Sequence, residues 1–393
     1  MPARILRAMA VYLDHNATTP LHPRAREAML PWLGERHGNP SSIHAFGQAA
    51  REAVEEAREA VAALIDGRPP EVVFTASGTE ANNAVVFHAL KGGGHLVISA
   101  IEHPSIREAA ARLEKEGVEV TRVSPGVDGI VPAAEVVRAL RPDTRLVCLM
   151  LANNELGTLQ PVAEVAAACR QRGVLILTDA VQAVGKIPVD VHALGVDYLV
   201  LGAHKFNGPL GAAALWVRKG VAVTGYLVGG SQERRRRAGT ENVPAIAGLG
   251  AAAAAAREEM ADRVAHLAAL RDRFENELPR RVPGVVFHCR TSPRLPNTSH
   301  VAFPGAEGES LLIRLDLAGY AVSTGAACSS GMVEPSRTLL AAGISREEAL
   351  ASLRVSFGIT NTREDVDGFL DALAREVAEL RRVSPGAPRE AVA

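Results

Sequence analysis

The strongest constraint on the fold of this chain is a repeated alternation of strand-like and helix-like segments between Glu71 and Val217. Short apolar runs of strand composition are followed by turns and, in most cases, by segments with helical spacing of apolar residues. This alternation is typical of an α/β fold, in which a mostly parallel sheet is flanked by helices. Strands are expected at Glu71–Thr75, His95–Ser99, Glu119–Val123, Leu146–Leu151, Val174–Leu177, Tyr198–Leu201 and Gly211–Val217.

A change of pattern in the last third of the chain predicts a second, smaller α+β domain. The Ala-rich segment Pro244–Leu270 predicts a helix long enough to tie one domain to the next. Beyond it, helices and strands no longer alternate regularly, so we place the boundary near Ala256–Met260. Residues 13–257 are expected to form the large α/β domain. Residues 258–393, with residues 1–12 packing nearby, are expected to form the small domain.

Composition limits the classes of function. The net charge is −1, which argues against general attraction to nucleic acid or to an anionic membrane. Hydrophobic residues make up 47% and charged residues 22% of the chain, as in ordinary globular proteins with a large core. No stretch approaches the ~20 apolar residues of a membrane span, and the N-terminus does not read as a signal peptide. A cytoplasmic protein is expected.

Polar clusters follow directly after several of the expected strands. In open α/β sheets, ligands bind at the edge where the strands end. One such cluster would be unremarkable, but several at one edge favour a binding site there. The clusters are Ser77–Thr79, Glu102–His103, Asn153–Glu155, Asp179–Gln182 and His204–Lys205.

Lys205 stands between two apolar runs in the stretch DYLVLGAHKFNGPLGAAALWV, Asp197–Val217. Burial disfavours the ammonium form of lysine and leaves an amine that can form a Schiff base with a carbonyl compound. A lysine in a turn can equally well extend its head to solvent. This stretch alone leaves both interpretations open.

Three other positions provide what a pyridoxal phosphate site needs. The small-residue turn Ser77–Thr79 precedes a helix and can hold a phosphate, although it can also be an ordinary N-cap. Asp179 follows an apolar strand and could pair with a pyridinium nitrogen, although capping a following helix is its commoner role. His103 can stack on the ring and transfer protons near neutral pH.

These motifs resemble the cysteine desulfurases, which are fold-type I pyridoxal-phosphate enzymes of the class V aminotransferase group. The resemblance extends in family order from about Tyr12 to Phe357. The motifs are YLDHNATTP (Tyr12–Pro20), GNPSS (Gly38–Ser42), FTASGTEANN (Phe74–Asn83), EHPS (Glu102–Ser105), NNELGT (Asn153–Thr158), TDAVQAVGK (Thr178–Lys186), GAHKFNGPLG (Gly202–Gly211), RRAGTENV (Arg236–Val243) and TGAACSSG (Thr324–Gly331).

The resemblance implies a role for each matching residue. Lys205 would hold pyridoxal 5′-phosphate and carry protons, and His103 would stack on the ring and act as acid or base. Asp179 would pair with the pyridinium, and Gln182 would hydrogen-bond the ring oxygen. The remaining contacts would come from Gly78, Thr79 and His204 to the phosphate, from Asn154 to the cofactor and substrate, and from Arg354 to the substrate carboxylate.

Thr240 would reach the phosphate from a second subunit, so the resemblance also implies a homodimer. The neighbouring Arg234–Arg237 would by themselves be interpreted mainly as a solvated loop. Many relatives carry a serine where this chain has Gly202, and this departure puts one phosphate contact in doubt.

Cys328 differs from the other cysteines. Cys148, Cys169 and Cys289 lie in apolar patterns that predict core packing, and the four cysteines show no zinc-like spacing. Cys328 lies in the polar, glycine-containing loop TGAACSSGMVEPS. In the family the matching cysteine attacks the substrate sulfur and becomes a persulfide, leaving alanine.

The resemblance therefore implies an L-cysteine desulfurase that passes sulfur to acceptor proteins, such as an iron–sulfur scaffold. No resident metal is expected, although the persulfide on Cys328 could be a transient ligand of an iron–sulfur cluster. A selenocysteine lyase or a class V aminotransferase of the same fold is the nearest alternative. An inactive scaffold that binds an acceptor is the alternative from another class.

Overall fold

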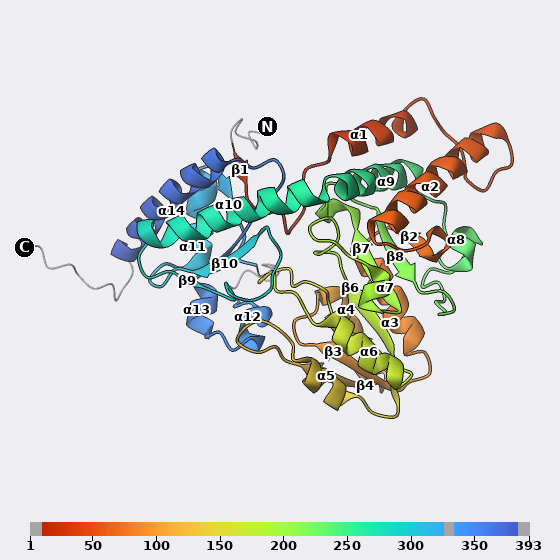
Figure 1. Ribbon diagram of the computed structural model, residues 1–393, viewed down its shortest axis with the longest axis horizontal. Helices are drawn as coiled ribbons and strands as arrows, with labels where there is room; N and C mark the ends of the chain where they lie inside the picture. The colour runs from red at the N-terminus through yellow and green to blue at the C-terminus, as the bar shows by residue number, and fades with distance from the viewer. Residues whose placement is uncertain (1–9, 326–333, 384–393) are drawn as a thin grey trace, which may run out of the picture.

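The computed structural model describes residues 10–325 and 334–383. Its larger part is built on a seven-stranded sheet with the order β2-β8-β7-β6-β5-β3-β4 (Figure 1). Six of the strands run in one direction, and β8 runs in the opposite direction between β2 and β7. The strands are β2 (Val72–Thr75), β3 (His95–Ser99), β4 (Glu119–Val123), β5 (Thr144–Cys148), β6 (Leu175–Asp179), β7 (Tyr198–Gly202) and β8 (Ala213–Val217). The expected strands are confirmed, with ends shifted by a few residues.

Helices cover both faces of this sheet. Successive residues of the central strands enter different cores, because side chains alternate along a strand. Leu96 and Ile98 of β3 pack with α3 (Gly78–Ala89) and α4 (Pro104–Lys115). Val97 belongs to the opposite core, which is formed with α2 (Ala45–Leu64), α5 (Ala133–Ala139), α6 (Val162–Gln171) and α9 (Val243–Glu258). The predicted α/β class is confirmed.

The expected single helix over Pro244–Leu270 is wrong, because the chain forms two helices, α9 and α10 (Met260–Arg281), on either side of Glu259. Alanine and glycine let α9 pack closely on α2, and a Cβ at Gly250 would lie 2.5 Å from the Cα of Ala57. By contrast, α10 leaves the large sheet and enters a second core (Figure 1).

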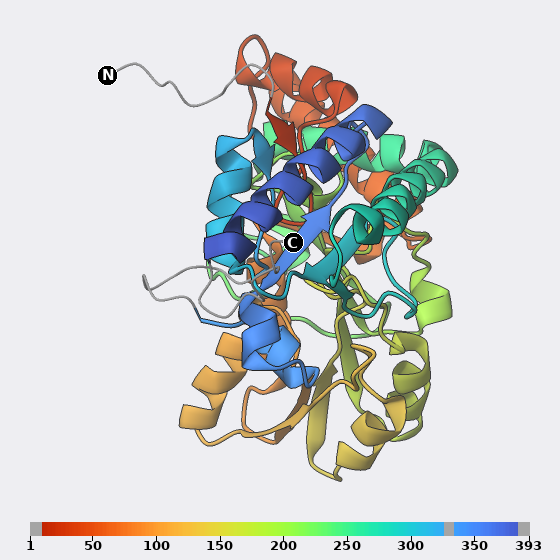
Figure 2. The ribbon, with the colours of Figure 1, turned by 90° about the vertical axis from the view of Figure 1, so that its left-hand side faces the viewer.

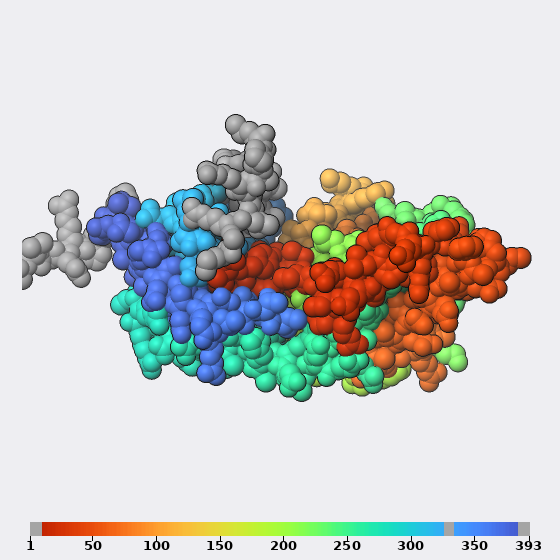
Figure 3. Space-filling view, turned by 90° about the horizontal axis from the view of Figure 1, so that it is seen from above, coloured from red at the N-terminus to blue at the C-terminus, as the bar shows by residue number. Residues whose placement is uncertain are grey.

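The second core surrounds a three-stranded antiparallel sheet with the order β12-β10-β9. The N-terminal strand β1 (Val11–Tyr12) pairs in parallel with β11 (Tyr320–Ala321), and Leu13 is buried in this core. Figure 3 shows the red N-terminal segment on the surface beside the blue C-terminal elements. The other elements are β9 (Val286–Phe287), β10 (Thr298–Ala302), β12 (Ser352–Ser356), α11 (Gly308–Leu317) and α14 (Arg363–Val383).

Several short elements complete the described chain. Helices α12 (Arg337–Ala341) and α13 (Arg346–Leu350) lie below the small sheet, toward the large one (Figures 1 and 2). None of the helices described is long and apolar enough to cross a membrane. The remaining elements are α1 (Pro23–Met29), α7 (Val191–Leu194), α8 (Gln232–Arg235) and the 3-10 turns Leu30–Leu33, Pro69–Glu71 and Ala203–Lys205.

The predicted core positions of Cys148 and Cys169 are confirmed, since both are fully buried. The same prediction for Cys289 is only partly right, because this residue is partly buried and packs against a small buried cluster that contains Leu156 and Leu339. Its backbone has a φ of 54°, and its thiol lies 3.8 Å from the carbonyl oxygen of Val127 at a turn after β9. Cys328 lies outside the described residues.

Candidate active site

The ends of the parallel strands enclose a cavity of about 320 Å³. It is bounded by the large sheet, the N-terminal segment around Asn16, and Arg354 of β12. This arrangement is consistent with the expectation that the polar clusters lie together at one edge of the sheet. The predicted residues that line the cavity are Gly78, Thr79, His103, Asn154, Asp179, Gln182, His204, Lys205 and Arg354.

Lys205 projects into this cavity from the 3-10 turn that follows β7. Its Nζ donates to the carbonyl oxygens of Asn16 and Ala17, each at 2.6 Å. Burial and then the charge of Arg354 lower the pKa of Lys205 from 10.5 to about 8. About a tenth of the amine is therefore neutral and nucleophilic at pH 7, far more than in an exposed lysine.

Asp179 is buried at the end of β6 and is held by two donors. Its Oδ2 accepts from Nδ2 of Asn82 at 2.7 Å, and its Oδ1 accepts from the backbone N–H of Val181 at 3.0 Å. No helix begins directly after Asp179, because the chain continues in turns. The alternative role as a helix N-cap is therefore wrong.

His103 is the N-cap residue of α4. Its Nδ1 accepts from the backbone N–H of Ser105 at 3.2 Å, and it lies 2.8 Å from Oγ of Ser105, which itself accepts from Nδ2 of Asn82 at 2.9 Å. These contacts make Nδ1 an acceptor, so the ring proton lies on Nε2. Burial is the main cause that lowers the pKa of His103, so the ring is mostly neutral at neutral pH.

The candidate phosphate-binding groups lie at the N-terminus of α3. Ser77 caps this helix through a hydrogen bond from the N–H of Glu80 to its Oγ at 3.1 Å. His204 lies beside the same cavity, and burial lowers the pKa of its ring to about 4. A Cβ at Gly202 would meet Val181 only at an ordinary contact distance of 3.5 Å, so crowding does not explain this glycine.

Arg354 is held in place on the side of β12. Its Nη2 pairs with Oδ1 of Asp14 at 2.6 Å, and its Nη1 donates to the carbonyl oxygen of Asn154 at 3.0 Å. Nε of Arg354 is buried and has no partner among the described atoms. Arg354 also lines the cavity, so its fixed positive charge stands beside any ligand bound there.

Thr240 does not line the cavity that contains Lys205 of the same chain. It is exposed and lines a different cavity, of about 200 Å³, together with Phe74 and Glu233. The interpretation of Arg234–Arg237 as a solvated loop is only partly right. Arg237 is partly buried and pairs with Glu80 at 2.9 Å, whereas Arg234 is exposed.

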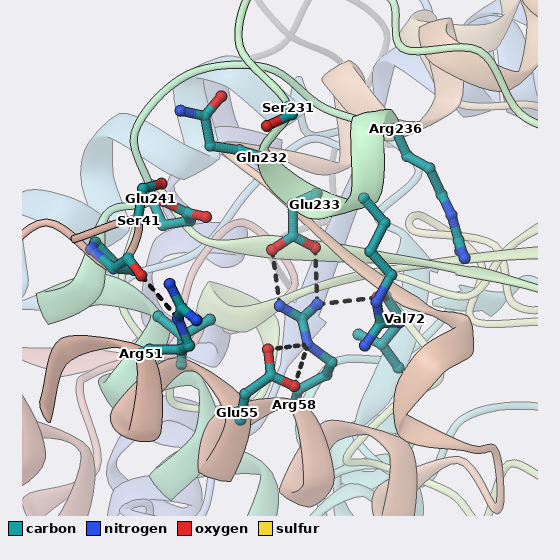
Figure 4. Close-up of a pocket in the computed structure, with 13 residues that line it drawn as sticks. Ser41, Arg51, Glu55, Arg58, Val72, Ser231, Gln232, Glu233, Arg236 and Glu241 are labelled. Atoms are coloured by element: carbon teal, nitrogen blue, oxygen red, sulfur yellow. Dashed lines mark hydrogen bonds and ion pairs between the residues drawn. The ribbon is translucent and has the colours of Figure 1, made fainter. Parts of the chain in front are cut away.

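A further cavity borders this arginine-rich segment (Figure 4). Arg58 lines this cavity and forms a buried bidentate ion pair with Glu233, with contacts of 2.7 and 2.8 Å. Arg58 also donates to the carbonyl oxygen of Val72. This ion pair anchors the segment that carries Thr240 to α2 and β2.

Sequence reasoning assigned no role to four buried residues around the central cavity. Their side chains connect the predicted residues to one another, and only the spacing of family motifs could have pointed to them. They are Asn16, Asn82, Ser105 and Lys186.

The fold and the cavity define an α/β protein in which a lysine and a buried carboxylate line one cavity at the strand ends. The family model described as "Aminotransferase class-V" matches residues 11–369, and the chain belongs to this family. It is 45% identical over 379 residues to "Cysteine desulfurase IscS" of Dictyoglomus turgidum, covering 95% of this chain and 96% of the relative. Identity to the protein of the same name from Methanosarcina thermophila is 42% over 385 residues, covering 97% and 95% of the two chains.

Solved structures agree with this relationship. A protein titled "NIFS-LIKE PROTEIN" superposes with a TM-score of 0.88 at 35% identity, covering 94% of this chain and 100% of the other. A NifS-like protein from Rickettsia africae gives a TM-score of 0.85 at 33% identity, covering 94% and 99%.

Proposed function

We propose that the chain is a pyridoxal-phosphate-dependent L-cysteine desulfurase. The observation that carries the proposal is the joint placement of Lys205, Asp179 and His103 in one cavity. An amine with a lowered pKa, a buried carboxylate and a neutral imidazole are the groups that this chemistry requires. The curated relatives named cysteine desulfurase, over nearly the full length of the chain, support the choice of reaction.

The residues present fit pyridoxal 5′-phosphate. Lys205 would be its attachment point, and Asp179 would face its ring nitrogen. Oδ1 of Asn82 is buried beside Asp179 without a partner, as expected of a site that is completed by a ligand. The N-terminus of α3, at Gly78 and Thr79, would hold the phosphate. When bound, this cofactor withdraws electrons from the substrate carbon atom that is attached to nitrogen.

The protein groups would bind the substrate and move its protons. Arg354 would bind the carboxylate of L-cysteine beside Asn154. Nε2 of His103 carries the ring proton, and the neutral amine of Lys205 can accept a proton from the substrate and return it. Both groups line the same cavity, so they stand where they can exchange protons with a bound substrate.

The thiolate of Cys328 would then attack the sulfur atom of the substrate. The carbon–sulfur bond breaks, its electron pair stays with carbon, and carbon takes up a proton to give L-alanine. The sulfur remains on Cys328 as a persulfide, so L-cysteine and one thiol give L-alanine and one persulfide without an external oxidant. Transfer of this sulfur to acceptor proteins, such as an iron–sulfur scaffold, in the cytoplasm completes the proposal.

The reaction is tested by incubating the purified protein with pyridoxal phosphate, L-cysteine and a thiol reductant. The wild type is expected to release alanine and sulfide together, and Cys328→Ala is expected to release little sulfide while still binding the cofactor. The proposal fails if the wild type makes no alanine, or if Cys328→Ala makes sulfide equally fast. Borohydride trapping and peptide mapping should label Lys205, and label at Lys219 instead would overturn the site.

We further propose a homodimer in which Thr240 completes the phosphate site of the partner. Thr240 is exposed, and it lies on a segment that Glu233 anchors. Large apolar side chains are exposed on nearby parts of the chain, including Ile43 (89%) and Val228 (98%). Such exposure is typical of a surface that a partner covers.

A further inference from the structure

Lys186 is a buried lysine to which the proposed reaction assigns no role. It ends the motif TDAVQAVGK and is only 4% exposed. The preceding Gly185 has a φ of 79°, and a Cβ there would lie 2.3 Å from Cβ of Phe206. This tight turn fixes the point from which Lys186 extends toward the base of the active-site cavity.

The amine of Lys186 contacts two neutral oxygen atoms. Nζ donates to Oδ1 of Asn16 at 2.9 Å and to Oε1 of Gln182 at 2.8 Å. Within residues 10–325 and 334–383, no carboxylate forms an ion pair with it. Burial, and then the charges of Lys205 and Arg354, place the pKa of Lys186 well below its usual value. A buried amine in this setting costs stability that an apolar side chain would not.

Two contacts together decide which way the amide of Gln182 faces. The carbonyl oxygen of Asn16 can only accept, so Nε2 of Gln182 must face it, and Oε1 then faces Lys186, whose amine donates to it. Nε2 then donates one hydrogen to the carbonyl oxygen of Asn16, at 2.9 Å. Its second hydrogen has no protein acceptor among the described contacts, and Gln182 lines the active-site cavity.

Asn16 is itself held in place on several sides. Its Oδ1 also accepts from Nδ2 of Asn297 at 3.0 Å, and its Nδ2 donates to Oγ1 of Thr298 at 2.9 Å. Its carbonyl oxygen accepts from Lys205 as well as from Gln182. The amide of Gln182 is therefore fixed between a constrained carbonyl oxygen and the amine of Lys186.

We propose that Lys186 is a positioning residue that orients the amide of Gln182, so that an N–H group faces the cofactor in the active-site cavity. The inference rests on the proposed cofactor, because the N–H group would donate to the ring oxygen of pyridoxal phosphate. Lys186 itself touches neither the cofactor nor the substrate.

The test compares Lys186→Met with Lys186→Gln in the full chain. The two side chains are similar in length, but only glutamine can donate to Oε1 of Gln182. Titration of the apoprotein with pyridoxal phosphate, followed by absorbance, is expected to show about tenfold weaker binding by Lys186→Met. Lys186→Gln should recover part of this loss. Lys219→Met, at an exposed lysine, serves as the matched control and should bind as the wild type does.

A double-mutant cycle shows whether the effect passes through Gln182. In a Gln182→Ala background, Lys186→Met is expected to weaken binding by less than twofold, because no amide is left to orient. Equal affinities of Lys186→Met and the wild type would overturn the proposal, as would an equal loss in both backgrounds. If Lys186→Met does not fold, Lys186→Leu replaces it in the comparison with Lys186→Gln. A wild type that binds no pyridoxal phosphate would instead refute the proposed cofactor.

Discussion

At the scale of single residues, Lys205 is set apart by the balance of charges around its amine. After burial, the charge of Arg354 is the next largest cause of its lowered pKa, while Asp14 and Asp179 act in the opposite direction. The folded protein therefore favours the neutral amine at a pH where an exposed lysine is almost fully protonated. The pH dependence of the rate at which a carbonyl compound attaches to Lys205 should therefore reveal its lowered pKa.

The rate constant for attachment of pyridoxal phosphate to the apoprotein should rise with pH and level off above about pH 8, the pKa of Lys205. Below that pH the amine is protonated, and the rate should fall about tenfold per pH unit. Arg354→Gln removes a positive charge, so it should move the midpoint to higher pH. Stopped-flow absorbance from pH 6 to 10 measures both effects. A midpoint near 10.5 in the wild type would contradict the assigned pKa.

Residues of this site that directly follow a strand could be predicted from the sequence. Lys205, Asp179 and His103 each follow a buried strand, and the geometry of a parallel sheet brings such positions together. Asn82 was not predicted, because its role depends on a partner 97 positions away in the sequence. The same holds for Lys186, because the sequence of its turn does not show that Asn16, far away in the chain, will accept a hydrogen bond from its amine.

At the scale of elements, Glu155 joins the loop after β5 to α12. It is buried, and its carboxylate accepts hydrogen bonds from Oγ of Ser336 at 2.5 Å and from Oγ1 of Thr338 at 2.7 Å. A Cβ at Gly325 would lie 2.9 Å from Oε2 of Glu155. One carboxylate therefore contacts chain on both sides of residues 326–333, the segment that contains Cys328.

Glu155→Ala should lower the free energy of unfolding by about 2–4 kcal/mol, because it leaves two buried hydroxyl groups without an acceptor. Glu155→Gln keeps one acceptor oxygen and should cost less. Chemical denaturation of the two variants measures the difference. Combining Glu155→Ala with Ser336→Ala should cost less than the sum of the separate losses. Additive losses would show that the hydrogen bond between these residues contributes little.

The elements that sequence patterns missed are the short ones. Helices α12 and α13 have five residues each, too few to show the periodicity by which longer helices are recognised. They form because tertiary contacts stabilise them, as the Glu155 contacts do for α12. The domain boundary expected near Ala256–Met260 coincides with the break at Glu259, but the helix expected over Pro244–Leu270 runs across it, because no glycine or proline marks the end of α9.

At the scale of the whole molecule, hydrophobic cores lie on both faces of the large sheet and around the small sheet. The active-site cavity is lined mainly from the large sheet, and the small sheet adds Arg354 from β12. Asn16, Thr298 and Ser356 connect the two parts through buried hydrogen bonds. The division into domains at residues 257 and 258 stays a prediction. The described chain brings the predicted cofactor-binding residues together except for Thr240, and the proposed second subunit would account for that exception.

Mixed dimers can decide whether Thr240 acts across the subunit boundary. Lys205→Ala removes the amine of its own site, and Thr240→Asp places a negative charge where a phosphate would bind, so each variant alone should be inactive. In a mixed dimer, the Thr240→Asp chain keeps its Lys205 and receives Thr240 from the other subunit, which restores one complete site. Co-expressing the two variants should therefore recover roughly a quarter of the wild-type sulfide production, if subunits pair at random. If Thr240 acted within its own chain, both sites of the mixed dimer would remain defective. Absence of recovery, with mixed dimers demonstrated by differential tags, would rule out the shared site.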